Sequence, residues 1–214
     1  MFKNQFIVLF GSVARGDDNI NSDLDILLIN IDIYESENIL RQYKLPNYPH
    51  NYIEYNYDTF YKFHIEGSLF LHHIFLEGKA IYGNMQLWNK LKREFRVKSS
   101  FIDEIKKIQS DISLYRNLDF SNGFYLSVLD NIYPLLKNYC IFKLANKGIY
   151  IFNKKECIIE AVKNEQLRKK LLELQQFYDY STRNISLNLT IKPNSLEAKK
   201  LILTVYFLIK KDLV

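Results

Sequence analysis

Two short apolar runs near the N-terminus, joined by a polar segment, constrain the fold of this chain more than any other feature. Residues 6–10 are apolar, residues 24–31 are mostly apolar, and both runs are bounded by turn-forming residues, a pattern typical of short buried strands. Gly11 and Ser12 follow the first run directly. The segment therefore predicts two strands whose connection opens with a Gly-Ser turn.

Two carboxylates, Asp23 and Asp25, stand at the start of the second run and are its only acids. Side chains two positions apart on a strand point to the same face, so we expect these two to lie side by side. Adjacent carboxylates in a partly buried site repel each other by an energy on the order of 1 kcal/mol or more, so such a pair is retained where a proton or a metal ion bridges it. Two carboxylates that face a Gly-Ser turn suit divalent cations carrying a phosphate chain.

The spacing of these residues resembles that of a known family. Gly11-Ser12, then ten residues, then Asp23-Leu-Asp25 is similar to the motif of the DNA polymerase β-type nucleotidyltransferase superfamily. The longer string, Gly-Ser-x-Ala-Arg-Gly followed by Ser-Asp-x-Asp-Ile, resembles the small bacterial members called minimal nucleotidyltransferases. The resemblance covers roughly residues 5 to 83, and the sequence beyond them carries no motif that we recognise.

The resemblance implies an enzyme that transfers a nucleoside monophosphate from a nucleoside triphosphate, ATP foremost, to an acceptor hydroxyl and releases pyrophosphate. It also implies Mg²⁺ as cofactor, as two ions, one lowering the pKa of the attacking hydroxyl and the other holding the phosphates. Three carboxylates suffice as protein ligands for such a pair of ions. Asp23 and Asp25 are expected to be two of them.

The third carboxylate is expected on a neighbouring strand, at an apolar-acid-apolar step. Residues 48–58 alternate aromatic or apolar with polar residues, which predicts a strand with one solvated face. Glu54 occupies the step between Ile53 and Tyr55, and we assign it as the third catalytic and metal-binding acid, although aspartate is commoner at this position in the family. Its greater length also suits a base acting on the acceptor. Asp58, expected on the same face of the same strand, is the alternative.

Three residues of the first turn are expected to bind the nucleotide. Gly11 lets the backbone approach the phosphates closely. The resemblance implies that Ser12 offers its amide and hydroxyl to a β- or γ-phosphate oxygen, and Ser12 also suits a helix N-cap. Arg15 either pairs with phosphate or braces the loop against Asp17 or Asp18, and the sequence leaves both interpretations open.

Adjacent histidines, His72 and His73, lie within a helix predicted over residues 69–77. Neighbouring helical positions point about 100° apart, so the two side chains are poorly placed to ligate one ion. We expect one buried and one surface histidine rather than a metal site.

The expected fold class is α+β. A small mixed α/β nucleotidyltransferase domain, similar to the polymerase β palm, is predicted over residues 1–84, and an all-α helical bundle over residues 85–214. Apolar residues at spacings of three and four predict four or five amphipathic helices in the second half. Pro134 lies inside one of them and predicts a kink or a break there.

Charge separates the two halves. Residues 1–85 carry 6 Lys and Arg against 11 Asp and Glu, whereas residues 86–214 carry 23 against 13. A basic second half favours a polyanionic acceptor, or a partner that carries one, over a polycationic drug. The alternative is that these lysines line ordinary solvated helix faces.

Three acceptors are open at this point: a protein side chain, as in toxin-antitoxin modules of the family, an RNA 3′ end, or a small hydroxylated molecule such as an aminoglycoside. The contrasting hypothesis is a non-catalytic module that binds a nucleotide or a partner. In the family, minimal nucleotidyltransferases are often paired with helical ribonuclease-like domains that carry an arginine-histidine motif. The helical half of this chain contains no histidine and therefore lacks that motif. We expect instead a bundle that binds the acceptor or forms a homo-oligomer.

Membrane and secretory features are not expected. No apolar run reaches the length of a membrane span, and the N-terminus lacks the pattern of a signal peptide. The two cysteines, Cys140 and Cys157, lack metal-ligand spacing and are too few for a disulfide framework. We therefore expect a cytoplasmic, reduced protein.

Overall fold

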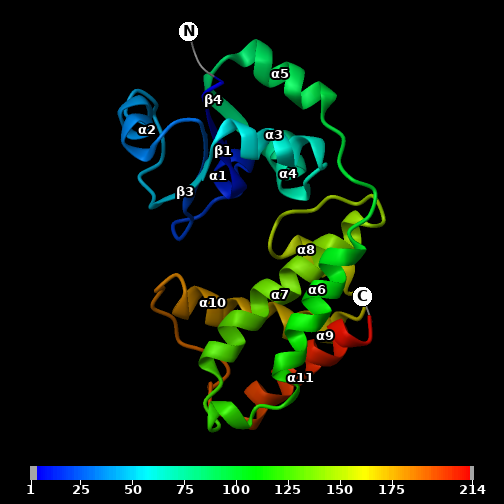
Figure 1. Cartoon of the computed structure of the whole chain (residues 1–214). Helices are drawn as coiled ribbons and strands as arrows, with labels where there is room; N and C mark the ends of the chain where they lie inside the picture. Colours follow the sequence, from blue (N-terminus) through cyan, green and yellow to red (C-terminus); the bar gives the residue numbers. More distant parts are fainter. Residues whose placement is uncertain (1–3, 213–214) are drawn as a thin grey trace. The chain divides into compact units, whose positions relative to one another are not determined.

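The computed structural model describes residues 4–212, which form two compact units that divide between Lys98 and Ser99 (Figure 1). The first unit is a mixed α/β domain and the second is mostly helical, which confirms the predicted α+β class. Each unit has its own hydrophobic core.

A four-stranded sheet of order β3-β2-β1-β4 forms the centre of the first unit. β1 (Phe6–Phe10) pairs antiparallel with both β2 (Leu24–Ile29) and β4 (Lys79–Gly83). β2 pairs in parallel with β3 (His50–Tyr55). Parallel neighbours need a crossover connection, and α2 (Ile33–Leu40) lies within it.

Helices cover both faces of this sheet. α1 (Gly11–Arg15) and α2 pack on the face that carries Leu24, Ile26 and Leu28. The opposite face, which carries Leu27 and Ile29, is covered by three further helices around an aromatic-rich core. These are α3 (Tyr57–Ile65), α4 (Leu69–Glu77) and α5 (Met85–Glu94).

The packing of α5 joins it to the first unit. Trp88, Leu91 and Phe95 are buried in the aromatic core of the sheet. Beyond the helix, the backbone N–H of Lys98 donates to the carbonyl of Gly67 over 3.0 Å. The boundary predicted from the sequence lies between residues 84 and 85, before α5, whereas the contacts divide the chain after α5, because its apolar stripe faces the sheet.

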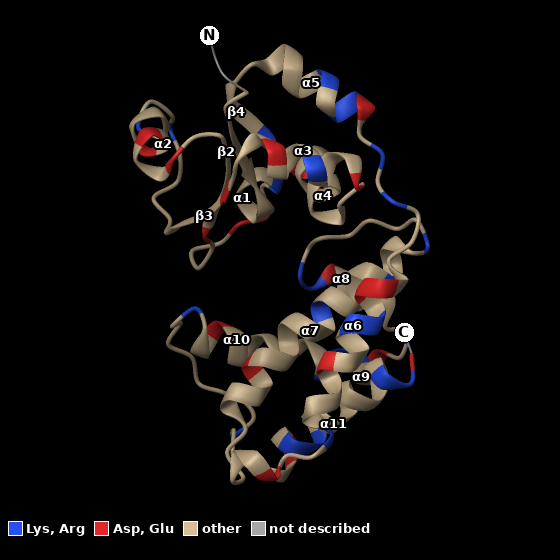
Figure 2. Cartoon of the chain, viewed as in Figure 1, with Lys and Arg blue, Asp and Glu red and all other residues tan. Residues whose placement is uncertain are grey.

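The position of this division changes the distribution of charge. Residues 1–98 carry 11 Lys and Arg against 12 Asp and Glu, and the remaining residues carry 18 against 12. The contrast between the units is therefore weaker than the contrast between the predicted halves. The difference comes from a basic segment on and just after α5, visible in blue in Figure 2, which contains Lys90, Lys92, Arg93, Arg96 and Lys98.

The second unit is built around α7 (Leu126–Ala145), which packs against several other helices of the unit. α7 continues through Pro134. Of the two outcomes predicted for this proline, a kink or a break, the break is therefore wrong. Within residues 4–212, no helix has the length and apolar character needed to cross a membrane. The other α-helices of the unit are α6 (Ile102–Asp111), α8 (Glu156–Ala161), α9 (Glu165–Leu172), α10 (Gln175–Ser181) and α11 (Leu196–Lys210).

Candidate functional site

The polar residues of the Gly-Ser motif meet at one end of the sheet. Asp25, the second residue of β2, lies opposite Phe10, the last residue of β1, and opposite Asn51 of β3. Asp23 directly precedes β2 and is half-buried, like Asp25. Residues paired across neighbouring strands point to the same face, as do residues two apart along one strand. The register therefore gathers Asp23, Asp25 and Asn51 at one end and on one face of the sheet.

Gly11 is required by two features of this site. Its φ of +72° lies in the left-handed region that only glycine enters at low cost. In addition, a Cβ built on Gly11 would collide with Oδ2 of Asp25. The residue that turns the chain from β1 into α1 is thus also the one that leaves space around the Asp25 carboxylate.

Ser12 is the second residue of α1 and is half-buried. Its carbonyl accepts hydrogen bonds from the backbone N–H groups of Gly16 and Asp17, over 2.8 and 3.1 Å. Phe10 occupies the N-cap position and its side chain makes no capping bond. Ser12 is therefore not the N-cap that the sequence allowed.

Asn51 contacts Asp25 directly. Its Nδ2 donates a hydrogen bond to Oδ1 of Asp25 over 2.8 Å. An amide donor stabilises the negative charge of a carboxylate, so Asp25 has a partial positive partner within the protein. No local sequence signal distinguishes Asn51, although it lies on the strand in which a third site residue is expected.

The strand register separates Glu54 from the two aspartates. Glu54 pairs with Leu28, three positions further along β2 than Asp25 and on the other face of the sheet. Three strand residues span about 10 Å. Glu54 therefore lies on the face of the sheet that α2 covers. Asp25 lies on the opposite face, the one that carries Leu27. The placement of Glu54 beside Asp23 and Asp25 that the sequence predicts is therefore not observed, and its role as a ligand stays a prediction.

Asp58, the alternative acid, is not on a strand. β3 ends at Tyr55, and the side chain of Asn56 accepts a hydrogen bond from the backbone N–H of Thr59 over 2.7 Å, which caps α3. Asp58 is exposed in the first turn of that helix, where a carboxylate is favoured by the helix dipole. The alternation of apolar and polar residues continues to Asp58 in the sequence, but the strand ends at Tyr55 because the Asn56 cap begins a helix.

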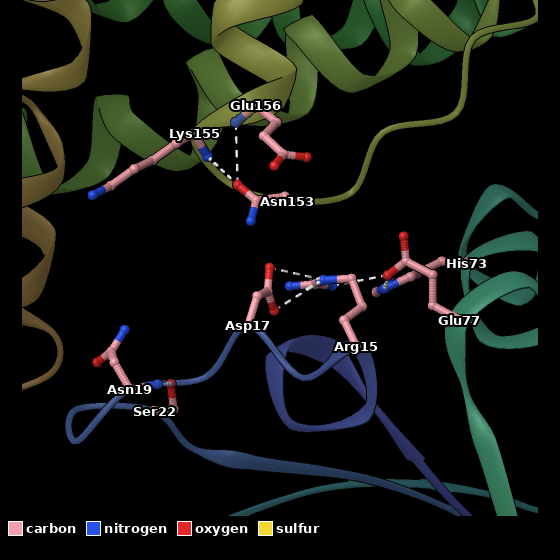
Figure 3. Close-up of polar contacts among 9 residues, drawn as sticks. All are labelled: Arg15, Asp17, Asn19, Ser22, His73, Glu77, Asn153, Lys155 and Glu156. Carbon is pink, nitrogen blue, oxygen red and sulfur yellow. Dashed lines mark hydrogen bonds and ion pairs between the residues drawn. The ribbon is translucent and has the colours of Figure 1, made fainter.

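Arg15 is held by acidic side chains of its own unit (Figure 3). Its Nη1 donates to Oε2 of Glu77 over 2.8 Å, and its Nε lies 3.2 Å from each carboxylate oxygen of Asp17. Nε2 of His73 lies 3.0 Å from the same Oε2 of Glu77. Arg15 therefore braces the loop against Asp17, one of the two roles that the sequence leaves open. Its second partner, Glu77, lies far away in the sequence and is not predictable from the local pattern.

This ionic cluster, formed by Arg15, Asp17, His73 and Glu77, joins α1 to α4. Burial opposes the charge of Glu77, but its hydrogen bonds with His73 and Arg15 outweigh burial and hold the pKa of the carboxyl below its ordinary value. Burial also opposes the Arg15 cation, while hydrogen bonds to Glu77 and Asp17 keep its pKa above the ordinary value. Glu77 is thus a partly buried anion that is stabilised by one partner on its own helix and one on α1.

The neighbouring histidines differ from the sequence-based expectation. His72 and His73 are both half-buried, whereas one buried and one surface residue were predicted. The His72 ring stacks on Phe95, and burial followed by the proximity of His73 lowers the pKa of its imidazole. His73 meets Phe10 edge to face, with 5.8 Å between ring centroids. The two rings pack separately and do not converge on one point.

The loop before Asp23 is ordered by its own hydrogen bonds. Ser22 is buried, its Oγ accepts from the backbone N–H of Asn19 over 2.9 Å, and its own N–H donates to the Asn19 carbonyl (Figure 3). The hydroxyl of Tyr48 donates to Oδ2 of Asp18 over 2.9 Å. These contacts fix the chain just before the first carboxylate of the site.

The donor set can be compared with the cation that the resemblance implies. Asp23 and Asp25 supply carboxylate oxygens and Asn51 an amide oxygen, all of them ligand types that Mg²⁺ accepts. The space left by Gly11 lies beside this set. No cluster of three or more His, Cys, Asp or Glu that could hold a metal occurs within the described residues. The site therefore fits a divalent cation, but not through three carboxylates.

The comparisons agree with the motif. Residues 2–87 match the family model described as Polymerase beta, Nucleotidyltransferase, and the match includes the Gly-Ser turn and both aspartates. The helical unit lies outside the match, and a comparison with the curated proteins finds none that matches the chain. The N-terminal domain of this chain therefore belongs to the polymerase β-like nucleotidyltransferase superfamily.

Proposed function

We propose that this chain is a Mg²⁺-dependent nucleotidyltransferase that moves a nucleoside monophosphate from a nucleoside triphosphate, ATP foremost, to a hydroxyl of a macromolecular acceptor. The acceptor oxygen forms a bond to the α-phosphorus, and the bond from that phosphorus to the bridging oxygen breaks. The electron pair leaves with pyrophosphate, and the acceptor proton passes to solvent or to a base.

The observation that carries this proposal is the contact between Gly11 and Asp25. A tight turn is enough to explain the positive φ of Gly11. It does not explain why the Asp25 carboxylate packs into the space that a Cβ on residue 11 would fill. An anion placed against a glycine turn, next to a second carboxylate, is suited to a cation that brings phosphates close to the backbone. The family match of residues 2–87 supports the same chemistry.

Each site residue has a separate role in the proposal. Gly11 and Ser12 hold the triphosphate, and Asp23 and Asp25 hold Mg²⁺. When bound, Mg²⁺ neutralises phosphate charge and lowers the pKa of the attacking hydroxyl. Arg15 acts by holding α1 against α4 through Glu77, which keeps the Gly-Ser turn in place.

A protein side chain or an RNA 3′ end is the proposed acceptor, in a setting such as a toxin-antitoxin module. The basic segment on and after α5 supports a polyanionic target or a partner that carries one. The same charges oppose an aminoglycoside, which is polycationic. The segment lies within the domain that contains the site, so it does not depend on the helical unit.

One observation favours a second candidate, a nucleotide-binding module without transferase activity. The position opposite Asp25 on β3 carries an uncharged amide, Asn51, instead of an acid. A site with fewer charged ligands holds its cation more weakly, and an amide cannot take up the acceptor proton as a carboxylate can. Binding of the triphosphate through Gly11, Ser12 and the two aspartates is compatible with this candidate as well.

The deciding experiment incubates the protein with Mg²⁺, ATP labelled at the α-phosphate and a cell lysate. We expect label in a macromolecule, and digestion with protease or with ribonuclease identifies its class. The Asp25→Asn variant should transfer no label, while Glu54→Gln, an exposed change on the other face of the sheet, should match the wild type. Nucleotide binding without transfer to any acceptor would support the second candidate instead.

A further inference from the structure

We propose that Asn51, and not Glu54, is the third side chain of the cation site, so that this chain binds its divalent cation through two carboxylates and one amide. The inference deepens the proposed function because it concerns the same site. Its test is the binding of a cation alone, which does not require turnover.

The geometry assigns this position to Asn51 in two ways. Asn51 is the β3 residue opposite Asp25, and its amide lies within 2.8 Å of that carboxylate. Glu54 is three positions further along the strand and on the opposite face. A one-residue change of register reverses the face of every side chain on a strand, and the observed register is held by six consecutive pairs from Leu24–His50 to Ile29–Tyr55.

Asn51 affects the site differently from an acid. In the absence of a cation, its Nδ2 donates to Asp25 and partly satisfies that carboxylate. To bind a cation together with Asp25, the amide must give up this bond and present its oxygen. The site then contributes two negative charges instead of three, and the affinity of oxygen-ligand sites depends on the number of charged ligands.

Replacing Asn51 by aspartate gives two opposite expectations. The two side chains have nearly the same shape, so the local packing is retained. Without a cation, the substitution removes the hydrogen bond to Asp25 and places two carboxylates within a few Å, which lowers stability. With a cation, the added charge strengthens binding. A residue outside the site would show neither effect.

The experiment titrates Mn²⁺ alone into the full chain by calorimetry and records melting temperatures with and without Mn²⁺. For Asn51→Asp we expect affinity to rise by about tenfold or more, a lower melting temperature without Mn²⁺, and a larger increase in melting temperature on adding it. Asp25→Asn should weaken binding by about tenfold or more. Glu54→Gln, the matched control on the same strand, should leave the affinity unchanged.

Asn51→Ala provides a second variant that cannot repel Asp25. It removes the amide oxygen and should weaken Mn²⁺ binding several-fold. Unchanged affinity in both Asn51 variants, or a loss in Glu54→Gln as large as in Asp25→Asn, would overturn the inference. If Asn51→Asp binds Mn²⁺ more tightly but no variant transfers a nucleotide, the cation site stands and the transferase proposal fails.

Discussion

The two units of this protein differ in where polar side chains from separate elements meet. In the first unit, the ionic cluster draws Arg15 from α1 and Glu77 from α4, which are 62 residues apart in the sequence. Asp25 and Asn51 likewise come from two strands with a helix between them. These contacts exist only when separate elements are assembled.

The second unit, like the first, has ion pairs that are local in sequence. Lys169 pairs with Glu165 and Arg183 with Asp179, each four residues apart in sequence. Such pairs stabilise a helix by about 0.3–0.5 kcal/mol and need no tertiary contact. Asp212 is an exception, because Lys143 and Tyr139 from α7 both contact it. Burial alone would raise the pKa of the Asp212 carboxyl, but the hydrogen bonds from these two residues outweigh burial and lower it.

The buried polar groups of the second unit also differ in kind from those of the first. Burial raises the pKa of the Cys157 thiol to about 12 and that of Cys140 well above its ordinary value, so both remain thiols that fill the core. The comparison teaches that burial alone does not mark a functional site. In the first unit, charged and amide groups from separate elements meet beside the left-handed Gly11.

The largest effect is expected for Asp25→Asn. Removing one of two charged ligands should lower nucleotide transfer by at least about a hundredfold, because cation and phosphate charge are no longer balanced at the site. Asp179→Asn, in the second unit, should leave transfer unchanged. Steady-state rates with labelled ATP check this, and wild-type turnover in Asp25→Asn would refute the assignment of Asp25.

Paired glycine variants compare the two units next. Gly11 and Gly148 both have positive φ, +72° and +74°, but a Cβ at Gly148 meets nothing within 4 Å whereas one at Gly11 collides with Asp25. Alanine at Gly148 should cost about 1 kcal/mol of unfolding free energy. Alanine at Gly11 should cost more than about 2 kcal/mol, because the overpacking adds to the same backbone strain. Urea unfolding measures both, and equal losses would show that the Asp25 carboxylate moves aside freely.

The ionic cluster gives the next effect. At pH 7, Glu77→Gln should lower the unfolding free energy by about 1–3 kcal/mol, because a half-buried carboxylate that pairs with Arg15 and contacts His73 is lost. The pKa of Glu77 is depressed in the folded state, so its contribution is present above the ordinary value of 4.5 and disappears as pH falls through the lower folded value.

The matched control for Glu77 is Asp179→Asn, since the two side chains are 16% and 17% exposed. Asp179 is contacted by Arg183 and Gln175, both within four residues of it, so its loss breaks contacts that are local in sequence and should cost less, about 0.5–1 kcal/mol. Unfolding curves from pH 7 down to about pH 2.5, below the depressed pKa of Glu77, test the comparison. A loss for Glu77→Gln that does not shrink toward acid pH would mean that its charge is not what joins α1 to α4.

The smallest effect concerns exposed charges. Reversing Lys92, Arg93 and Arg96 to glutamate should weaken binding of tRNA at low salt. It should also make the slope of log K against log salt concentration less steep, by about 0.7–0.9 per lost phosphate contact. At physiological salt the difference should shrink, because exposed charges are screened. Reversing Lys163, Lys169 and Lys170 in the second unit is the control. Electrophoretic shift assays at two salt concentrations decide, and no binding even at low salt would favour a protein acceptor.

The sequence by itself determined the features that depend on near neighbours in the chain. Gly11, Asp23 and Asp25 are placed by short apolar runs and turn residues, and the helix predicted over residues 69–77 coincides with α4. The family match at residues 2–87 agrees with that local pattern. Apolar periodicity and turn chemistry act over a few residues, so they can be read without knowing the fold.

Only the tertiary structure decided which residue stands beside Asp25. The alternation around Glu54 fits a strand, but which face and which partner it meets depends on the pairing of β2 with β3. That pairing is fixed by burial of both faces of the sheet and by where the strands begin, and a shift of one residue would exchange the faces. The partnership of Arg15 with Glu77 and the packing of α5 on the sheet follow the same rule, because each depends on contacts between residues far apart in the chain.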